Sequence, residues 1–143
     1  MLGLLSGCAG AAPKHFTEAQ SPDRFTPCSG APHCVSSQAA PGSSHYVAPF
    51  TYTGGIRHAR EVLLQTLRTS DHAIMARAEP RFIHATFRSA VLGFVDDVTF
   101  ILQPQQDIID VQSSARLGYY DFGVNRRRVE QLRTRFESLL KGP

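Results

Sequence analysis

Residues 113–128, SSARLGYYDFGVNRRR, carry the chain from a strand-like pattern through a glycine turn into a helix. Asn125 is predicted to be the N-cap of this helix, because an asparagine side chain accepts a hydrogen bond from an unpaired amide of the first turn. Val124 would then precede the cap and contact Val129, which is the spacing of a hydrophobic staple. We therefore expect the last helix to begin near Arg126.

Three successive arginines follow Asn125 and face the positive end of the helix dipole. Each is unfavourable there by about 0.3–1 kcal/mol, so a compensating charge is expected. Asp121 and Glu130 are close enough in sequence to supply it. An anion bound where free amides and guanidinium groups converge would do the same, and the sequence leaves both explanations open.

The chain has 143 residues, of which 42% are hydrophobic, as is typical of one globular domain with a sizeable core. Its net charge of +3 comes from the C-terminal part, because residues 113–143 hold seven basic and three acidic side chains. A basic terminal helix suits an anionic lipid, a nucleic acid or an acidic partner, and equally a plain solvated face.

Hydrophobic periodicity divides the remainder into strands and helices. Apolar residues recur at helical spacing over residues 55–69 and again in the last helix, which should end at Gly142 and Pro143. Elsewhere they alternate with period two. The predicted strands cover residues 45–52, 72–78, 81–89, 96–102 and 109–116, the first of them an edge strand interrupted by Pro49.

These elements predict an α+β fold, with an antiparallel sheet of four to five strands and both amphipathic helices packed on one face. Ile83, Val98 and Val111 belong to the face that turns inward. The opposite face is expected to be polar and uncovered, and it would gather the following side chains: His84, Thr86, Arg88, Asp110, Gln112, Ser114 and Arg116.

The first eight residues resemble the end of a bacterial lipoprotein signal. Residues 5–8, LSGC, fit the lipobox pattern, although the apolar run is shorter than a whole signal and no basic residue precedes it. The resemblance implies that Cys8 is acylated. Because Ala9 follows it, the resemblance also implies an outer membrane lipoprotein of the bacterial cell envelope that faces the periplasm. Residues 9–27 are expected to form a flexible tether.

Cys28 and Cys34 enclose a short loop that contains glycine and proline. If the chain is exported, as the lipobox implies, these two thiols meet an oxidising compartment and are expected to form a disulfide. Free thiols are an alternative, and so is a metal site completed by His33, His15 or His45, although the spacing matches no zinc pattern. We predict no metal and no cofactor.

Four motifs occur in an order similar to that of domain-of-unknown-function family 1499, which is found in bacterial envelope proteins and some plastid proteins. They are HCVSS at residues 33–37, HATFRS at 84–89, FVDDV at 94–98 and SSARLGYYDFGVNR at 113–126. The resemblance runs from about residue 28 to 139, so we expect a single domain over residues 28–141. It implies no activity, and His33 and Thr86 depart from the residues common in the family.

The expected function is therefore a binding or interaction module for an anionic ligand. Candidate partners are an anionic small molecule, a lipid or an acidic protein, besides the membrane that holds the anchor on Cys8; nucleic acid is not expected. Ion pairs of Arg88 and Arg116 with Asp110 or Asp121 are the structural explanation of the same charges. The candidate ligand-binding residues are His84, Arg88, Asp110, Arg116, Asp121, Asn125 and Arg126.

The rival hypothesis is a small hydrolase in which His84 is the base and Asp110 or Asp96 orients it. No nucleophile elbow, zinc-protease helix or phosphate loop supports this hypothesis. Asp96 and Asp97 could instead hold a cation together with Asp110 or Asp121, but paired acids at a strand start more often bind arginine.

Overall fold

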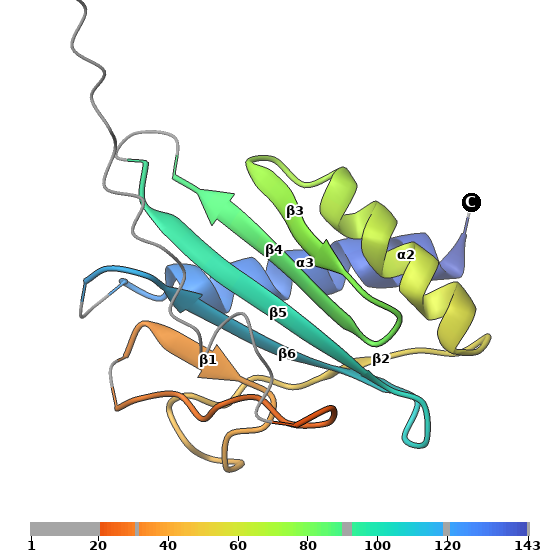
Figure 1. The fold of residues 1–143 in the computed structure, drawn as a ribbon, viewed down its shortest axis with the longest axis horizontal. Helices are drawn as coiled ribbons and strands as arrows, with labels where there is room; N and C mark the ends of the chain where they lie inside the picture. Colours follow the sequence, from red (N-terminus) through yellow and green to blue (C-terminus); the bar gives the residue numbers. More distant parts are fainter. Residues whose placement is uncertain (1–20, 31, 90–92, 119–120, 143) are drawn as a thin grey trace, which may run out of the picture.

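The computed structural model describes residues 21–30, 32–89, 93–118 and 121–142, and within them the fold is α+β. Figure 1 shows a twisted sheet with two helices. The helices are α2 (Ile56–Arg68) and α3 (Val124–Lys141). The strands are β1 (Cys34–Ser36), β2 (Phe50–Thr51), β3 (Ala73–Ala78), β4 (Phe82–Arg88), β5 (Val95–Gln103) and β6 (Ile108–Ala115).

The sheet has six antiparallel strands in the order β1-β6-β5-β4-β3, and β2 also pairs with β6. β1 lies against residues 112–114 of β6 and β2 against residues 108–109, so two short strands share one edge of β6. The prediction of four to five strands was therefore too low. A strand of three residues is too short to display alternation, and the expected strand at residues 45–52 is reduced to Phe50 and Thr51.

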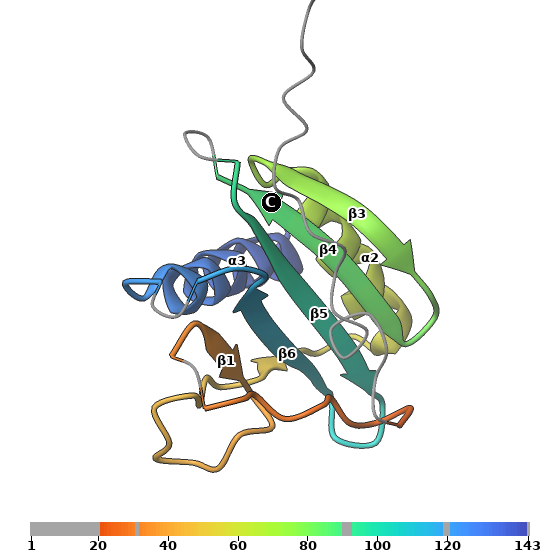
Figure 2. The same cartoon turned by 60° about the vertical axis from the view of Figure 1, so that its left-hand side comes forward.

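Alternation along the strands decides which side chains enter the core, as predicted. Val98 is paired with Ala85 on one side and with Ser113 on the other. The buried apolar cluster takes alternate residues of β4, β5 and β6 together with residues of both helices. Figure 2 shows α2 and α3 behind the same side of the sheet. The hydrophobic cluster therefore lies between this side and the two helices.

Three phenylalanines occupy the centre of this core. The ring of Phe50 lies 5.9 Å from that of Phe100 and 5.4 Å from that of Phe136, measured between centroids. Phe50 comes from the short strand β2, Phe100 from the central strand β5 and Phe136 from α3. Aromatic burial thus connects three elements that are distant in sequence.

Residues 21–28 lie against the other side of the sheet, where a tether and an uncovered face were expected. Phe25 is buried, and its amide donates a hydrogen bond to the side chain of Gln38 at 2.8 Å. The side chain of Gln112 donates to the carbonyl of Thr26 at 2.9 Å, and that of Gln103 to the carbonyl of Asp23 at 3.0 Å. The described part of the domain therefore begins before residue 28, and part of the polar face is covered.

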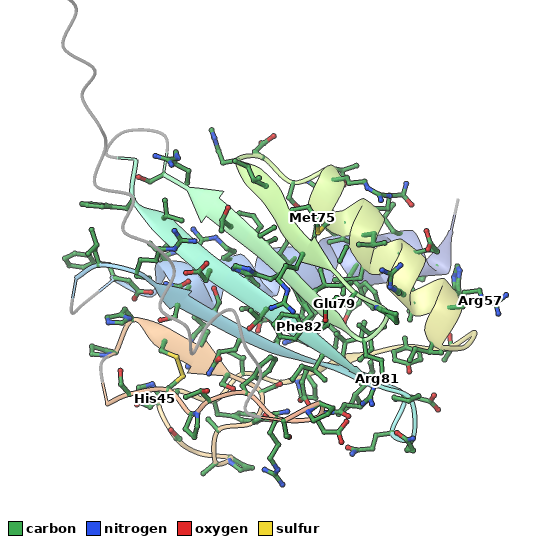
Figure 3. The ribbon with its side chains drawn as sticks, in the orientation of Figure 1. His45, Arg57, Met75, Glu79, Arg81 and Phe82 are labelled. Carbon is green, nitrogen blue, oxygen red and sulfur yellow. A yellow bond between two sulfur atoms is a disulfide. The ribbon has the colours of Figure 1, made fainter. Side chains whose placement is uncertain are left out.

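A disulfide joins Cys28 to Cys34 and attaches the end of this covering segment to β1. It is drawn in yellow near His45 in Figure 3. The ring nitrogen Nδ1 of His45 lies 2.8 Å from the carbonyl oxygen of Cys34. The predicted disulfide is present, and His45 contacts its backbone.

We expect Phe136→Ala to lower the free energy of unfolding by about 3–5 kcal/mol, because it opens a cavity at the centre of the core. Phe94→Ala is the matched control, since the side chain of Phe94 is exposed. Chemical denaturation of both variants measures the difference. Equal stabilities would contradict the assignment of Phe136 to the core.

Candidate functional site

The polar side of the sheet contains an ion-pair cluster of His84, Asp97 and Arg116. One carboxylate oxygen of Asp97 lies 2.7 Å from Nε2 of His84 and accepts a hydrogen bond from Nη2 of Arg116 at 2.9 Å. The other oxygen accepts from Nε of Arg116 at 2.8 Å. The three groups come from β4, β5 and the residue after β6, so alternation brings them to one face.

Asp97 is fully buried, yet it is held in its charged form. Burial acts to raise its pKa, but the hydrogen bonds and charges of His84 and Arg116 outweigh burial, so the pKa lies below the ordinary value of 3.8. His84 is 2% exposed, and within the described residues its other ring nitrogen, Nδ1, has no hydrogen-bond partner. The cluster is thus a charged interior group of the domain.

Asp110 belongs to a different network. Its carboxylate accepts hydrogen bonds from the hydroxyl of Ser37 at 2.7 Å, from Gln38 at 2.9 Å and from Gln103 at 3.1 Å. The structure therefore corrects the predicted ion pairs: Arg116 pairs with Asp97, and Asp110 with neutral side chains. The physical reason is that residues 37 and 38 reach the outer side of β6, where amide and hydroxyl donors occupy both oxygens.

The side chain of Asp121 stabilises the start of α3 by hydrogen bonds. Its carboxylate accepts hydrogen bonds from the amides of Gly123 at 2.9 Å and Asn125 at 3.0 Å, and from the side chain of Asn125 at 2.8 Å. Partial burial acts to raise the pKa of Asp121, but these hydrogen bonds outweigh it and lower the pKa. A carboxylate at this position also compensates the positive end of the helix dipole.

Asn125 is not the N-cap, and the helix begins at Val124 instead of near Arg126. Asn125 lies inside the first turn, fully buried, and its side-chain oxygen accepts a hydrogen bond from the hydroxyl of Ser113 at 2.6 Å. Because Asp121 satisfies the first free amides, the asparagine side chain is available to connect α3 to β6. The predicted N-cap was therefore two residues too late, since Gly123 occupies that position.

The three arginines at the helix start bind different partners. Arg128 pairs with Asp96 at 2.6 Å and lies over the ring of Phe87. Arg126 donates to the carbonyl of Tyr46 at 2.7 Å and to that of Ser44 at 2.6 Å. Asp121 and Asp96 supply the compensating carboxylates, whereas Glu130 pairs with Arg133.

Asp96 and Asp97 face opposite sides of β5, because adjacent strand residues do so. Burial raises the pKa of Asp96, and the charges of Asp121 and Asp97 add to this effect, while Arg128 opposes it. The two carboxylates therefore do not converge on one cation, as the metal alternative for this pair required. Among the described residues, no group of three possible metal-ligating side chains is present.

A cleft of about 1360 Å³ lies between α3, the turn that follows α2 and the end of β4. We call it the arginine cleft. Its floor includes Phe87, Leu132 and Leu139, and its acidic residues are Asp71 and Glu130. Its basic residues are His72, Arg88, Arg126, Arg127, Arg128 and Arg135.

Four of these arginines are held by backbone carbonyls. Arg88 donates to Gly93 at 3.4 Å and Arg127 to Phe122 at 2.8 Å. Arg126 donates to the two carbonyls named above, and Arg135 to that of Thr69. A carbonyl positions a guanidinium group without neutralising its charge. Within the described residues none of the four forms an ion pair, so their positive charges face the cleft uncompensated by direct contact.

The predicted site residues fall into separate places. Arg88 and Arg126 line the arginine cleft on the helix side, whereas His84, Asp110 and Arg116 lie on the polar side of the sheet. Asp121 and Asn125 form the junction at the start of α3. Asp97 was missed as the partner of His84, although the alternation that places Val98 inward places the adjacent Asp97 outward.

The fold is that of a small α+β protein with a cleft lined by basic side chains. The chain belongs to the family described as "Protein of unknown function (DUF1499)", whose match covers residues 24–136. No curated protein and no solved structure matches the chain. Cys8 lies outside the residues that the structure describes, and no helix in the described part is long and apolar enough to cross a bilayer.

Asp97→Asn is expected to lower the free energy of unfolding at neutral pH by about 3 kcal/mol, because it leaves Arg116 beside a neutral partner. A carboxylate whose pKa is lowered by folding contributes stability above its unfolded pKa and loses it as the pH falls through the folded pKa. The difference between wild type and variant should therefore shrink below about pH 4. Urea denaturation as a function of pH measures it.

Asp107→Asn is the control for this titration, since Asp107 is exposed in the β5–β6 turn. Its φ of 53° is one that asparagine accepts readily. A constant stability difference between wild type and Asp97→Asn from about pH 7 to pH 3 would show that the Asp97 carboxylate is not responsible.

Proposed function

We propose that this protein is a binding module for an anionic ligand and that the arginine cleft is its site. One observation carries the proposal: backbone carbonyls hold Arg88, Arg126, Arg127 and Arg135, and none of the four forms an ion pair with another residue that the structure describes. Holding a side chain in place before binding reduces the entropy that binding costs. Each guanidinium group has five donors, so one or two bonds to carbonyls leave donors for a ligand.

The dimensions of the cleft favour an extended ligand. Its volume of about 1360 Å³ exceeds the roughly 300–1,000 Å³ of ordinary small-molecule pockets. The apolar floor formed by Phe87, Leu132 and Leu139 adds a surface for a carbon skeleton. A molecule that carries a phosphate or carboxylate on an apolar or sugar framework fits both features.

We also propose the cellular location predicted from the sequence, the bacterial cell envelope. Cys8 would carry the lipid at the outer membrane, and the domain would face the periplasm. The Cys28–Cys34 disulfide supports this part, because disulfides persist in oxidising compartments.

The hydrolase hypothesis has less support. It needs His84 oriented by Asp110 or Asp96, but the hydrogen-bond partner of His84 is Asp97. The carboxylate of Asp110 is occupied by Ser37, Gln38 and Gln103, and that of Asp96 pairs with Arg128. His84 is also buried. A base must reach the proton that it removes, so the arginine cleft is the better candidate site.

Calorimetric titration with inorganic pyrophosphate tests the cleft. We expect binding to the wild type, and a loss of at least about tenfold in affinity for each of Arg88→Gln and Arg127→Gln, because each removes a charge-assisted hydrogen bond. Arg57→Gln is the matched control: Arg57 is exposed near the start of α2, at the opposite end of the molecule from the start of α3 (Figure 3). Equal affinities in all four proteins, or no binding to the wild type, would contradict the proposal.

Labelling with radioactive palmitate in a Gram-negative host tests the anchor, with the basic and apolar residues of a lipoprotein signal placed before Met1. We expect label on the wild type and none on Cys8→Ser. The double variant Cys28→Ser and Cys34→Ser should keep the label. Label that survives Cys8→Ser would refute acylation at this cysteine.

A further inference from the structure

Exposed apolar side chains gather where two loops meet at one end of the sheet. Phe94 is 51% exposed, Leu117 is 50% exposed and Phe122 is 77% exposed. Phe94 directly precedes β5, Leu117 follows the end of β6 and Phe122 precedes α3. We call these three residues the apolar tip.

The hydrogen bonds of the structure place the three residues at the same end. The amide of Arg116 donates to the carbonyl of Val95 at 3.1 Å, so the start of β5 lies beside the end of β6. The ion pair between Asp96 and Arg128 brings the first turns of α3 to the same strand start. Figures 1 and 2 both show the end of β4, the start of β5, the end of β6 and the start of α3 together.

Phe122 has a backbone conformation that stability alone does not favour. Its φ is 55°, in the left-handed region where a bulky residue is unusual. Its side chain is nevertheless 77% exposed. Such a residue is a reason to look for a function that uses the exposed ring.

An arginine of the cleft accompanies each of the two loops. Arg88 donates to the carbonyl of Gly93, next to Phe94, and Arg127 donates to the carbonyl of Phe122 itself. Both arginines are exposed. One arginine of the cleft is therefore held at the backbone of each of the two loops that carry the aromatic rings.

We infer that the apolar tip inserts into the surface of an anionic lipid bilayer while Arg88 and Arg127 bind the lipid phosphates. Aromatic side chains favour the interface between hydrocarbon and water, and each arginine near an anionic leaflet adds attraction. A protein partner would need a matching pocket for each projecting ring. A fluid bilayer accommodates such rings without a preformed pocket. This inference deepens the proposed function, because it names the phosphate of a membrane lipid as the anion.

The chain contains no tryptophan, so one introduced tryptophan reports on one position. The experiment uses the full chain with Cys8→Ser throughout, so that no acyl chain contributes. Phe94→Trp keeps an aromatic ring at the tip. Ala78→Trp is the control, since Ala78 is exposed at the β3–β4 turn, at the opposite end of the sheet from the tip.

We expect the fluorescence of Phe94→Trp to shift to the blue with phosphatidylglycerol vesicles and to be quenched by brominated acyl chains. Ala78→Trp should show neither change. In flotation assays, Phe94→Ser combined with Phe122→Asn should lower partitioning into these vesicles at least about tenfold. Asn accepts the backbone of position 122, so this variant should fold. Arg88→Gln and Arg127→Gln should each lower it about fivefold.

The titration with pyrophosphate separates this inference from the proposed function. The aromatic variants should keep the pyrophosphate affinity of the wild type while they lose vesicle binding. Vesicle binding that persists without Phe94 and Phe122, or a wild type that does not bind vesicles, would overturn the insertion even if pyrophosphate binds. Self-association abolished by Phe122→Asn, without vesicle binding, would overturn it by showing that the tip joins two copies of this chain.

Discussion

The carboxylates of Asp96 and Asp97 fix which side chains of the central strand β5 point to each face of the sheet. Asp96 turns toward α3 and pairs with Arg128, whereas Asp97 turns to the other side and pairs with His84 and Arg116. Ion pairs of this kind contribute little net stability, because removing charges from water costs about as much as the pairing returns. Their effect is on specificity. A slip of one residue would turn every side chain of β5 to the other face, leaving both carboxylates without their partners.

Alternation was sufficient to predict the inward and outward sides of the strands, but it says nothing about what covers each side. Asp110 and Gln112 were expected on an uncovered face because they are polar. They are buried, since residues 21–28 and Gln38 lie against them. This covering segment has no hydrophobic periodicity, and Phe25 is the one large apolar side chain within it, so its packing depends on hydrogen bonds between distant residues that a local pattern does not reveal.

The junction before α3 shows the same limit at a smaller scale. Asn125 and Asp121 are both good capping residues, and their order in the sequence does not decide between them. In the structure, the hydroxyl of Ser113 binds the buried side chain of Asn125. The carboxylate of Asp121 accepts hydrogen bonds from the amides at the start of α3 instead. The three arginines at the helix start are evident in the sequence, but the carbonyls of Ser44 and Tyr46 that Arg126 contacts could not be predicted from it.

Arginines at the two ends of the sheet have different sets of partners: the end at the start of β5 has the ion pairs of Arg116 and Arg128, but also arginines that are held by carbonyls. At the β3–β4 turn, Arg77 pairs with Glu79 and Arg81 with Asp23, so carboxylates neutralise the guanidinium groups there. At the other end, Arg88 and Arg127 are bound to carbonyls, which are dipoles and leave the full charge in place. An array of fixed, unneutralised cations raises the local concentration of anions. The exposed rings of Phe94 and Phe122 lie at this end, so charge attraction and apolar contact act on the same side of the domain.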